Sequence, residues 1–438
     1  MDFTVKDILH LEVAPALGCT EPVAIALGSA ACRVLAKEKP VSRLEVWVSS
    51  NIYKNGLAVS IPGTQGLSGI DLSAAIGAFG GDPQRRLEVL DGLEPEAVEQ
   101  AVQFVKAGHT KIHIQEEKTG VYIKTVLTAG EDRYESVIET LHDNITYLSV
   151  NGQAVEHDDL LGNTGDGGSK GEQLGKLEEW LKNLSLAELL DLVDDFDEED
   201  LEFIQTGVTY NTRLAEYGLK HGVGLGIGKA MQRLLRQKLL SNDMVLAART
   251  LTSAAADARM SGVKMPAMSS AGSGNHGLTA ILPIWAIREF IDVANEEVLR
   301  AIGFSHIITG YVKAFTGRLS AVCGCSVAAG AGATAGVTYL LGGDLNHISG
   351  AIKNLTTDLA GVICDGAKSG CALKLVTAAG TAVQASLFSL QGVVVEATDG
   401  IISHSPEQTM QNIGILSTQG MIDTDRTILK IMLDKQFS

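Results

Sequence analysis

The chain has 438 residues, enough for two or three domains with a large core, and 45% of its residues are apolar. Its formal net charge of −17 excludes the usual kind of nucleic-acid-binding protein, because an acidic surface repels phosphate backbones. The combination of 48 glycines with few aromatic residues favours closely packed helices built from small residues over a sheet sandwich.

The first forty residues predict two helices with a break between them. The N-terminus lacks a basic region followed by an apolar stretch, so we expect no secretory signal and a cytoplasmic protein with reduced cysteines. Residues 4–37 have helical character that is interrupted around Pro15 and Pro22, because proline disfavours a regular turn before it. Pro22 suits the first position of the second helix, predicted over Val23–Ala36. Cys19 would then lie near a helix N-terminus, where the macrodipole favours a thiolate.

Residues 41–150 predict an α+β domain with a mixed or antiparallel sheet and helices on one face. Strand-like alternation covers residues 44–50, 111–115 and 120–127, and helical patterns cover residues 66–79 and 95–107. A short Lys-Thr-Gly turn joins the two later strands, and we interpret this pair as a hairpin.

The rest of the chain predicts a helical body. Residues 151–180 have the composition of a linker, and residues 181–438 indicate an almost wholly helical catalytic domain. We expect residues 1–40 to join this body, so that the sheet domain at residues 41–150 is an excursion from it. The predicted fold class is therefore α+β: a mostly helical C-terminal body with the N-terminal helix packed on it, plus an inserted α/β sheet domain.

Two segments of the helical body could suggest a partner or a membrane, and their composition favours neither. Residues 188–202 carry nine carboxylates and no base, which is typical of a solvated helix face. Residues 319–343 carry no charge, but they are mostly Ala, Gly, Ser, Thr and Cys, so their transfer to lipid would be weakly driven. This run indicates a buried helix packed through small residues.

The glycine-rich segment Gly222–Lys229 resembles a phosphate-binding loop but departs from its pattern. Val223 stands where a P-loop needs glycine, and Ala230 stands where it needs serine or threonine. Ile227 occupies the third glycine position of the dinucleotide pattern. Close helix contact or local bending is the better explanation of these glycines.

A second run of small and polar residues, Pro266–Gly277, precedes a helix predicted over Leu278–Phe290. Its N–H groups and hydroxyls are free to converge on an anion at a helix N-terminus. The predicted carboxylate or phosphate cradle consists of Ser270, Gly272, Ser273, Gly274, Asn275 and His276. An ordinary loop with an N-cap is the plainer alternative. His276 is a candidate for orienting a substrate or protonating a leaving group, although a single histidine is as often structural.

The C-terminal part of the chain concentrates four of the six cysteines: Cys323, Cys325, Cys364 and Cys371. Free cysteine also packs as a small hydrophobe, and Cys32 fits that description on the apolar side of its helix. Thiols on polar, turn-forming segments suit metal ligation better. Zinc usually takes four ligands at Cys-x-x-Cys spacing, whereas three thiolates without an obvious fourth ligand match an iron–sulfur cluster with one open iron.

Four motifs in fixed order extend over essentially the whole chain: Gly18–Pro22, Met268–Gly277, Cys323–Cys325 and Cys364–Cys371. Together they resemble the L-cysteine desulfidase family, which is related to the α-chain of iron–sulfur L-serine dehydratases. The resemblance implies a pyridoxal-independent lyase that converts L-cysteine to pyruvate, ammonia and sulfide. It also implies a [4Fe-4S] cluster held by three cysteines, with one iron left for the substrate.

The resemblance further implies roles for single residues. Cys364 and Cys371 would be two cluster ligands, and the third would be Cys323 or Cys325, with Cys323 favoured. Cys19 matches the position of the family's proposed catalytic base. The serine dehydratases carry a Ser-His-Thr segment at what looks like the same place, which supports cysteine over serine as substrate. Beside Cys19, we expect Thr20 and Glu21 to contact the substrate together with the anion cradle.

Three alternatives remain open at this point. The first is an iron–sulfur L-serine or L-threonine dehydratase, the second a non-catalytic iron–sulfur sensor of cysteine or oxygen, and the third a structural zinc protein. The cradle and the remote thiol favour an enzyme, because a sensor needs no base. The expected partner is a small amino acid substrate, without nucleic acid or membrane, and the small-residue helices make a homodimer plausible.

Overall fold

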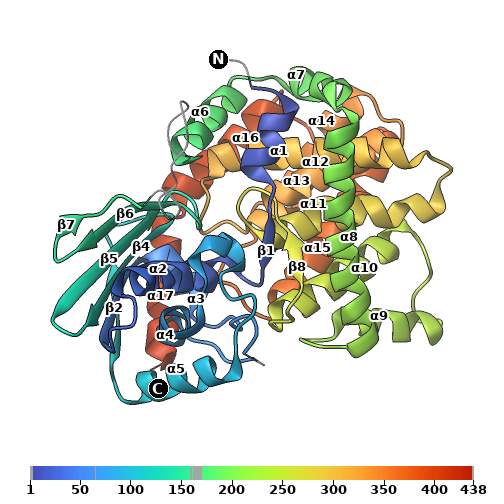
Figure 1. The fold of residues 1–438 in the computed structure, drawn as a ribbon. Coiled ribbons are helices and arrows are strands. Elements are labelled where there is room, and N and C mark those ends of the chain that lie inside the picture. Colours follow the sequence, from blue (N-terminus) through green and yellow to red (C-terminus); the bar gives the residue numbers. More distant parts are fainter. Residues whose placement is uncertain (1–2, 65, 158–159, 161–169, 437–438) are drawn as a thin grey trace.

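A helical body and a mixed sheet covered by helices lie side by side in this protein (Figure 1). The structure is a computed structural model, and it describes residues 3–64, 66–157, 160 and 170–436. Each part has its own hydrophobic core, with Leu282 and Ile307 in the core of the body and Ile25 and Val46 in that of the sheet. The predicted α+β fold class is confirmed.

The described part of the chain forms a sheet of six strands in the order β3-β2-β4-β5-β6-β7, and β2–β3 is its parallel pair. The strands are β2 (Val41–Ser49), β3 (Thr110–Gln115), β4 (Tyr122–Ala129), β5 (Asp132–Glu139), β6 (Ile145–Val150) and β7 (Gln153–Ala154). Because β2 lies between β3 and β4, the predicted hairpin of β3 and β4 is wrong. The buried residues Val46 and Val48 require β2 to be central, and this burial outweighs the short β3–β4 connection.

Helices pack on the sheet. They are α2 (Thr20–Ala36), α3 (Ser50–Gly56), α4 (Ile70–Gly80), η1 (Pro83–Glu88) and α5 (Pro95–Lys106). Helix α2 contacts β4, β5 and α4, and it is buried over most of its length. The first helix, α1 (Val5–Glu12), packs on the helical body through α12 (Asn295–Thr316), α6 (Lys170–Lys182) and η2 (Leu192–Asp195). Within residues 1–40, for which we expect a place in the body, α1 lies against the body, whereas α2 is apolar and fills the space between α4 and the sheet.

The helical body consists of the remaining helices of the described chain. They are α6 (Lys170–Lys182), α7 (Leu186–Asp191), η2 (Leu192–Asp195), α8 (Glu198–His221), α9 (Ile227–Arg236), α10 (Met244–Met260), α11 (Gly274–Ile287), η3 (Arg288–Phe290), α12 (Asn295–Thr316), α13 (Gly324–Leu340), α14 (Leu345–Leu359), α15 (Cys371–Leu390), α16 (Pro406–Ile415), η4 (Leu416–Gly420) and α17 (Ile422–Gln436). Helix α13 is buried among α11, α12, α14 and α15. This confirms the buried, small-residue helix predicted within residues 319–343. Helix α17 extends away from the body to contact α3.

Helix α15 passes a length-and-composition test for a membrane span, as no other described helix does. Within the protein, 56% of the apolar stretch of α15 is buried, and the helix packs against α10, α13 and α14. Central helices of helical bodies have the same composition, so we interpret α15 as a core helix.

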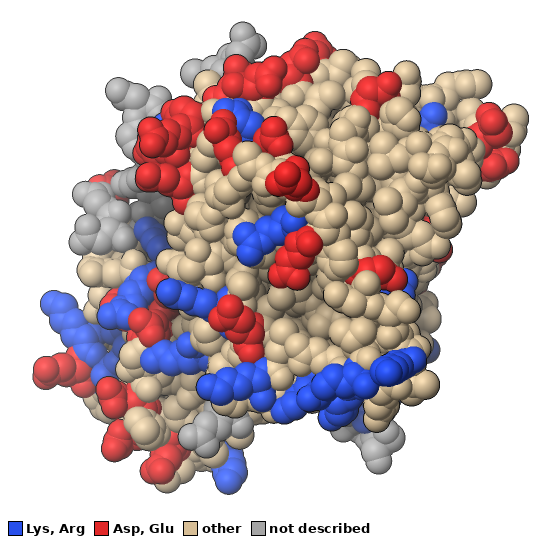
Figure 2. Space-filling model, turned by 90° about the vertical axis from the view of Figure 1, so that its right-hand side faces the viewer, with Lys and Arg blue, Asp and Glu red and all other residues tan. Residues whose placement is uncertain are grey.

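Two predictions about surface segments can be compared with the fold. The expected linker, residues 151–180, contains β7 and most of α6, while residues 158–159 and 161–169 lie outside the described residues. The acidic segment, residues 188–202, runs from α7 into the first turn of α8, at the top of the body in Figure 1. Figure 2 shows that acidic side chains gather at the top of the face it draws, whereas a row of lysines and arginines crosses the bottom. The negative charge is therefore unevenly distributed.

The backbone N–H groups of the loop Gly222–Lys229 bind a side chain of the protein itself. The Asp257 carboxylate accepts hydrogen bonds from the backbone N–H groups of Leu225 (3.1 Å) and Ile227 (2.6 Å). These are the groups that a bound phosphate would use. The loop therefore joins α8 to α9 through an internal carboxylate.

Candidate active site

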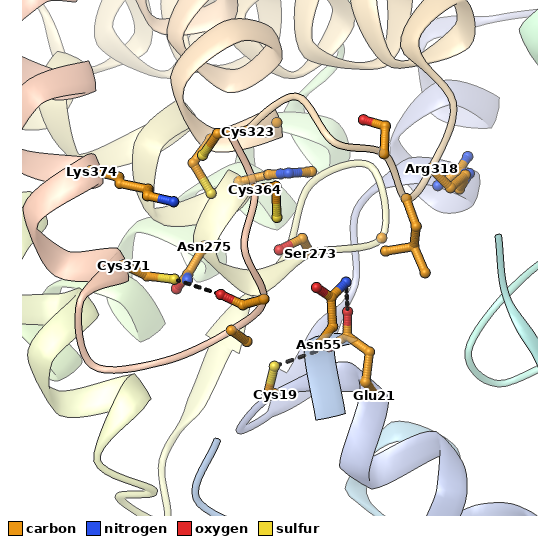
Figure 3. A pocket seen from close by; sticks show the side chains of 18 of the residues that line it. Cys19, Glu21, Asn55, Ser273, Asn275, Arg318, Cys323, Cys364, Cys371 and Lys374 are labelled. Carbon is orange, nitrogen blue, oxygen red and sulfur yellow. Dashed lines mark hydrogen bonds between the residues drawn. The ribbon is translucent and has the colours of Figure 1, made fainter. Parts of the chain in front are cut away.

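Residues from all four motifs line a cavity between the sheet part and the helical body (Figure 3). The predicted site residues that line it are Cys19, Glu21, Gly272, Ser273, Asn275, His276, Cys323, Cys325, Cys364 and Cys371. The cavity volume of ≈ 80 Å³ suits a small ligand. Four separate parts of the chain thus converge on one site.

A two-stranded sheet joins the first motif to the second. Strand β1 (Pro15–Leu17) pairs antiparallel with β8 (Pro266–Met268), and the carbonyl of Ala14 accepts from the Ser269 N–H at 2.8 Å. Arg259 strengthens the connection, since its guanidinium donates to the Gly18 carbonyl (2.5 Å) and to Asn275 Oδ1 (3.0 Å). The turn that carries Cys19 is therefore fixed against the N-terminus of α11.

Cys19 is the N-cap residue of α2, which begins at Thr20 and not at Val23 as predicted. Pro22 fits inside the first turn because the N–H groups of that turn have no helical partner. The Cys19 thiol donates to Glu21 Oε2 at 3.0 Å. Burial raises its pKa well above its usual range, and the Glu21 carboxylate raises that pKa further.

The thiolate predicted for Cys19 is therefore wrong for this arrangement of the site. A helix dipole stabilises a nearby anion by about 0.3–1 kcal/mol, whereas full burial can shift a pKa by up to about 3–5 units. The second effect outweighs the first, and Cys19 is a protonated thiol that is hydrogen-bonded to a carboxylate.

Glu21, expected from the sequence to contact the substrate, forms a hydrogen bond with Cys19. Its Oε2 also accepts from Thr20 Oγ1 (3.2 Å), and its Oε1 accepts from Asn55 Nδ2 (3.1 Å) and lies 3.9 Å from Nε2 of His142. Burial opposes ionisation, but His142 and the Cys19 hydrogen bond leave the pKa of Glu21 below its usual value. Glu21 is thus ionised beside the protonated Cys19 thiol, and the Thr20 hydroxyl donates to Glu21.

The third and fourth motifs are joined by backbone hydrogen bonds. The N–H of Cys323 donates to the Val362 carbonyl (2.8 Å), and the N–H of Cys364 donates to the Ala321 carbonyl (2.6 Å). Cys371 is the first residue of α15. These contacts place three cysteines on the same wall of the cavity, as Figure 3 shows.

The glycine of the Cys-Gly-Cys motif makes room for His276. A Cβ atom on Gly324 would lie 2.4 Å from Nε2 of His276, so no side chain fits there. Nδ1 of His276 lies 3.2 Å from the Ser270 carbonyl, which can only accept, so Nδ1 carries the proton. Burial lowers the pKa of His276 to about 3. The ring is therefore neutral and cannot protonate a leaving group through Nε2, in contrast to the role considered for it from the sequence.

The predicted anion cradle is smaller in the structure. Ser270 is fully buried, and its hydroxyl lies 2.9 Å from Nδ1 of His306, so it stabilises the loop from behind. Gly274 faces the Arg259 guanidinium. The members that line the cavity are Gly272, Ser273, Asn275 and His276.

The neighbouring thiols Cys323 and Cys325 differ in protonation. A hydrogen bond from Cys325 lowers the pKa of Cys323, and the same contact raises the pKa of Cys325. Burial lowers the pKa of Lys374, but its contacts with the Asp365 carboxylate and the Cys323 sulfur raise it above its usual value. Cys323 is therefore the more acidic thiol of the pair, and the Lys374 charge favours its thiolate form.

The cysteines fit an iron–sulfur cluster by the chemistry of their donor atoms. Among the residues that the structure describes, no three His, Cys, Asp or Glu side chains converge closely enough to hold a single metal ion. A cluster is wider than a single ion, so its thiolate ligands lie farther apart than those of one ion. Soft thiolate donors also favour iron–sulfur chemistry over oxygen-loving metals.

Two cations at the cavity were not predicted from the sequence. Lys313, at the end of α12, is buried and donates to the Arg318 carbonyl at 3.1 Å. Arg318 pairs with Glu12 (2.9 Å) and Glu178 (3.1 Å), while its buried Nη1 has no hydrogen-bond partner within the described chain. Both line the cavity and are suited to a substrate carboxylate. They belong to no motif, and the only signal was their position just before the uncharged segment.

Replacing Lys313 by methionine is expected to stabilise the metal-free protein. Burial, together with Arg318, lowers the pKa of Lys313 from 10.5 to about 8. Below pH 8 the buried charge therefore lowers the free energy of unfolding by about 3 kcal/mol. The gain should shrink between pH 8 and pH 10.5, where the folded-state lysine is already neutral. Thermal melts of both proteins at pH 7 and pH 10 test this. Lys118→Met, at an exposed pair with Glu139, is the control with little expected change. A lower melting temperature for Lys313→Met at pH 7 would contradict the assignment of a strained buried charge.

Comparison with known proteins agrees with this site. The family profile described as serine dehydratase alpha chain matches residues 85–430. A UPF0597 protein of Desulfatibacillum aliphaticivorans is 62% identical over 439 residues, covering 100% of both chains. A UPF0597 protein of Clostridioides difficile is 44% identical over 98% of this chain and 99% of its own length. The match includes three of the four motifs, and the predicted relationship to the serine dehydratases is confirmed. The chain therefore belongs to the serine dehydratase α-chain family, a family of iron–sulfur lyases.

Proposed function

We propose that this protein is a pyridoxal-independent lyase that cleaves L-cysteine to pyruvate, ammonia and sulfide. One observation carries the proposal: the hydrogen-bonded pair Cys19–Glu21 faces the same small cavity as the thiols of Cys323, Cys364 and Cys371. A proton acceptor, a set of soft metal ligands and cations for the carboxylate are the groups that an elimination from an amino acid requires.

A [4Fe-4S] cluster would be held by Cys323, Cys364 and Cys371, with Cys325 donating a hydrogen bond to Cys323. The backbone hydrogen bond from Cys323 to the Val362 carbonyl, two residues before Cys364, supports choosing Cys323 over Cys325 as the third ligand. When bound, the cluster supplies an iron that acts as a Lewis acid toward the sulfur that leaves.

The chain's own residues would hold the substrate and move its proton. The unpaired Nη1 of Arg318 and the Lys313 ammonium suit the carboxylate, and Ser273 and Asn275 also line the cavity. Transfer of the Cys19 proton to Glu21 costs free energy, because the pKa of Glu21 lies below that of Cys19, and it would leave a thiolate in place to take the Cα proton. Sulfide then departs with the electron pair of the C–S bond, and the free aminoacrylate hydrolyses to pyruvate and ammonia. No oxidant or reductant is needed.

The competing substrate is L-serine, because the matched family is described by that name. The first motif carries a thiol where the serine dehydratases resembled by this sequence carry Ser-His-Thr, which supports L-cysteine.

Product release from the two amino acids distinguishes these functions. Protein reconstituted anaerobically with iron and sulfide, and then desalted, should release sulfide and pyruvate in equal amounts from L-cysteine. It should form pyruvate more slowly from L-serine. Faster pyruvate formation from L-serine would select the dehydratase. No product from either amino acid, despite a bound cluster, would select a sensor.

A further inference from the structure

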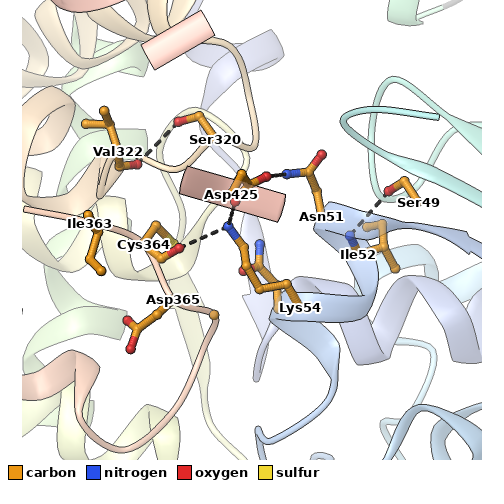
Figure 4. A network of polar contacts seen from close by, with 12 residues as sticks. Ser49, Asn51, Ile52, Lys54, Ser320, Val322, Ile363, Cys364, Asp365 and Asp425 are labelled. Carbon is orange, nitrogen blue, oxygen red and sulfur yellow. Dashed lines mark hydrogen bonds and ion pairs between the residues drawn. The ribbon is translucent and has the colours of Figure 1, made fainter. Parts of the chain in front are cut away.

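A buried ion pair joins three segments of the chain behind the cavity wall (Figure 4). We propose that the pair Lys54–Asp425 positions the cluster-binding loop by holding the backbone carbonyl of Cys364. The inference rests on the proposed cluster at Cys364, but it does not depend on the substrate. Lys54 is a positioning residue, because it acts through the peptide of a ligand.

The ammonium of Lys54 is fully enclosed. Its side chain is 1% exposed, its Nζ donates to the Cys364 carbonyl at 2.9 Å, and it forms an ion pair with Asp425 of α17. A buried ammonium without partners would be strongly unfavourable, so both acceptors are needed to keep it there. The C-terminal helix and the cysteine loop are thus fixed by one side chain of α3.

Asp425 is held from a second direction. Asn51, also on α3, donates from Nδ2 to Asp425 Oδ2 at 2.8 Å and accepts from the Gly120 N–H at 3.0 Å. Ser49 caps α3 by accepting from the Ile52 N–H, and its hydroxyl donates to the Gly120 carbonyl at 2.6 Å. Helix α3 is therefore fixed to the sheet before it meets the cysteine loop.

The cysteine loop also touches α3 directly through its backbone. Gly366 has a φ of +91°, and a Cβ atom there would lie 2.3 Å from the Lys54 carbonyl oxygen. Two contacts, one at Cys364 and one at Gly366, therefore fix the start of the loop that continues to Cys371.

The pair should control how long a cluster stays bound. A metal ligand whose supporting hydrogen bond is removed typically binds about 10–100-fold more weakly. Loss of Lys54 frees the Cys364 peptide, so iron should leave faster even when no substrate is present.

Three variants separate this role from a general effect on folding. Lys54→Met removes the donor, Asp425→Asn leaves the lysine without its counter-ion, and the double variant removes both buried charges. The control is Lys39→Met, which breaks a comparatively exposed ion pair with Asp132 on the sheet. Each protein is reconstituted anaerobically, and iron release to a chelator is followed by cluster absorbance, beside a thermal melt of the metal-free form.

The double variant should melt close to the wild type, because no lone charge stays buried, yet release iron about tenfold faster or more. Lys39→Met should behave as the wild type in both measurements. A double variant that folds and releases iron at the wild-type rate would overturn the positioning role and leave the proposed function intact. A wild-type protein that binds no cluster would overturn both.

Discussion

Cys19→Ala is expected to lower turnover of L-cysteine by at least about 10²-fold while the cluster stays bound. The side chain is outside the proposed ligand set, and its thiol is bonded to Glu21, so its removal takes away the proton acceptor alone. Steady-state pyruvate formation, measured beside iron content and the cluster absorbance of the same sample, tests this.

Cys32→Ala is the matched control for Cys19→Ala. Cys32 lies on the same helix, but its thiol is buried against the sheet and donates to the Thr125 carbonyl at 3.8 Å. Its loss should lower stability slightly and leave turnover near that of the wild type. If Cys19→Ala kept turnover near that of the wild type, Cys19 would have no role in catalysis.

Cys364→Ala and Cys371→Ala are each expected to lose bound iron after anaerobic reconstitution. Removing one of three thiolates leaves a cluster without the ligands that hold it. The same measurement resolves the third ligand: Cys323→Ala should also lose iron, whereas Cys325→Ala should retain it and change the spectrum only slightly. Iron per chain and the visible absorbance report both results.

Cys32→Ala again serves as the control, since it removes a thiol without touching the cavity. Full iron content in both Cys364→Ala and Cys371→Ala would contradict the ligand assignment. If Cys323→Ala kept its iron and Cys325→Ala lost its iron, Cys325 would be the third ligand in place of Cys323.

Local patterns in the sequence predicted the parts of the fold that local physics determines. The alternation in β2 and β4 and the uncharged run that contains α13 reflect burial of short segments, which a single stretch of sequence displays. The motif residues on the cavity wall were likewise recognisable, because thiols and a glycine-serine loop are uncommon in a helical chain.

Long-range pairing was beyond the reach of such patterns. Nothing near Pro15 indicates that β1 pairs with β8, and nothing near β3 shows that β2 separates it from β4. The cations Lys313 and Arg318 and the pair Lys54–Asp425 acquire their meaning only when distant segments meet. The sequence also misled the prediction of a Cys19 thiolate. The helix N-terminus beside Cys19 can be predicted from the sequence, whereas the burial of the thiol beside Glu21 cannot.

The central claim is a cluster with one iron open to the substrate in the cavity that contains Cys19. Mössbauer spectra of protein reconstituted with the Mössbauer-active iron isotope, recorded before and after addition of L-cysteine, test it most directly. The account predicts that one iron site of the cluster changes on addition of L-cysteine while the other three keep their parameters. A spectrum that L-cysteine leaves unchanged at every iron site would contradict the account.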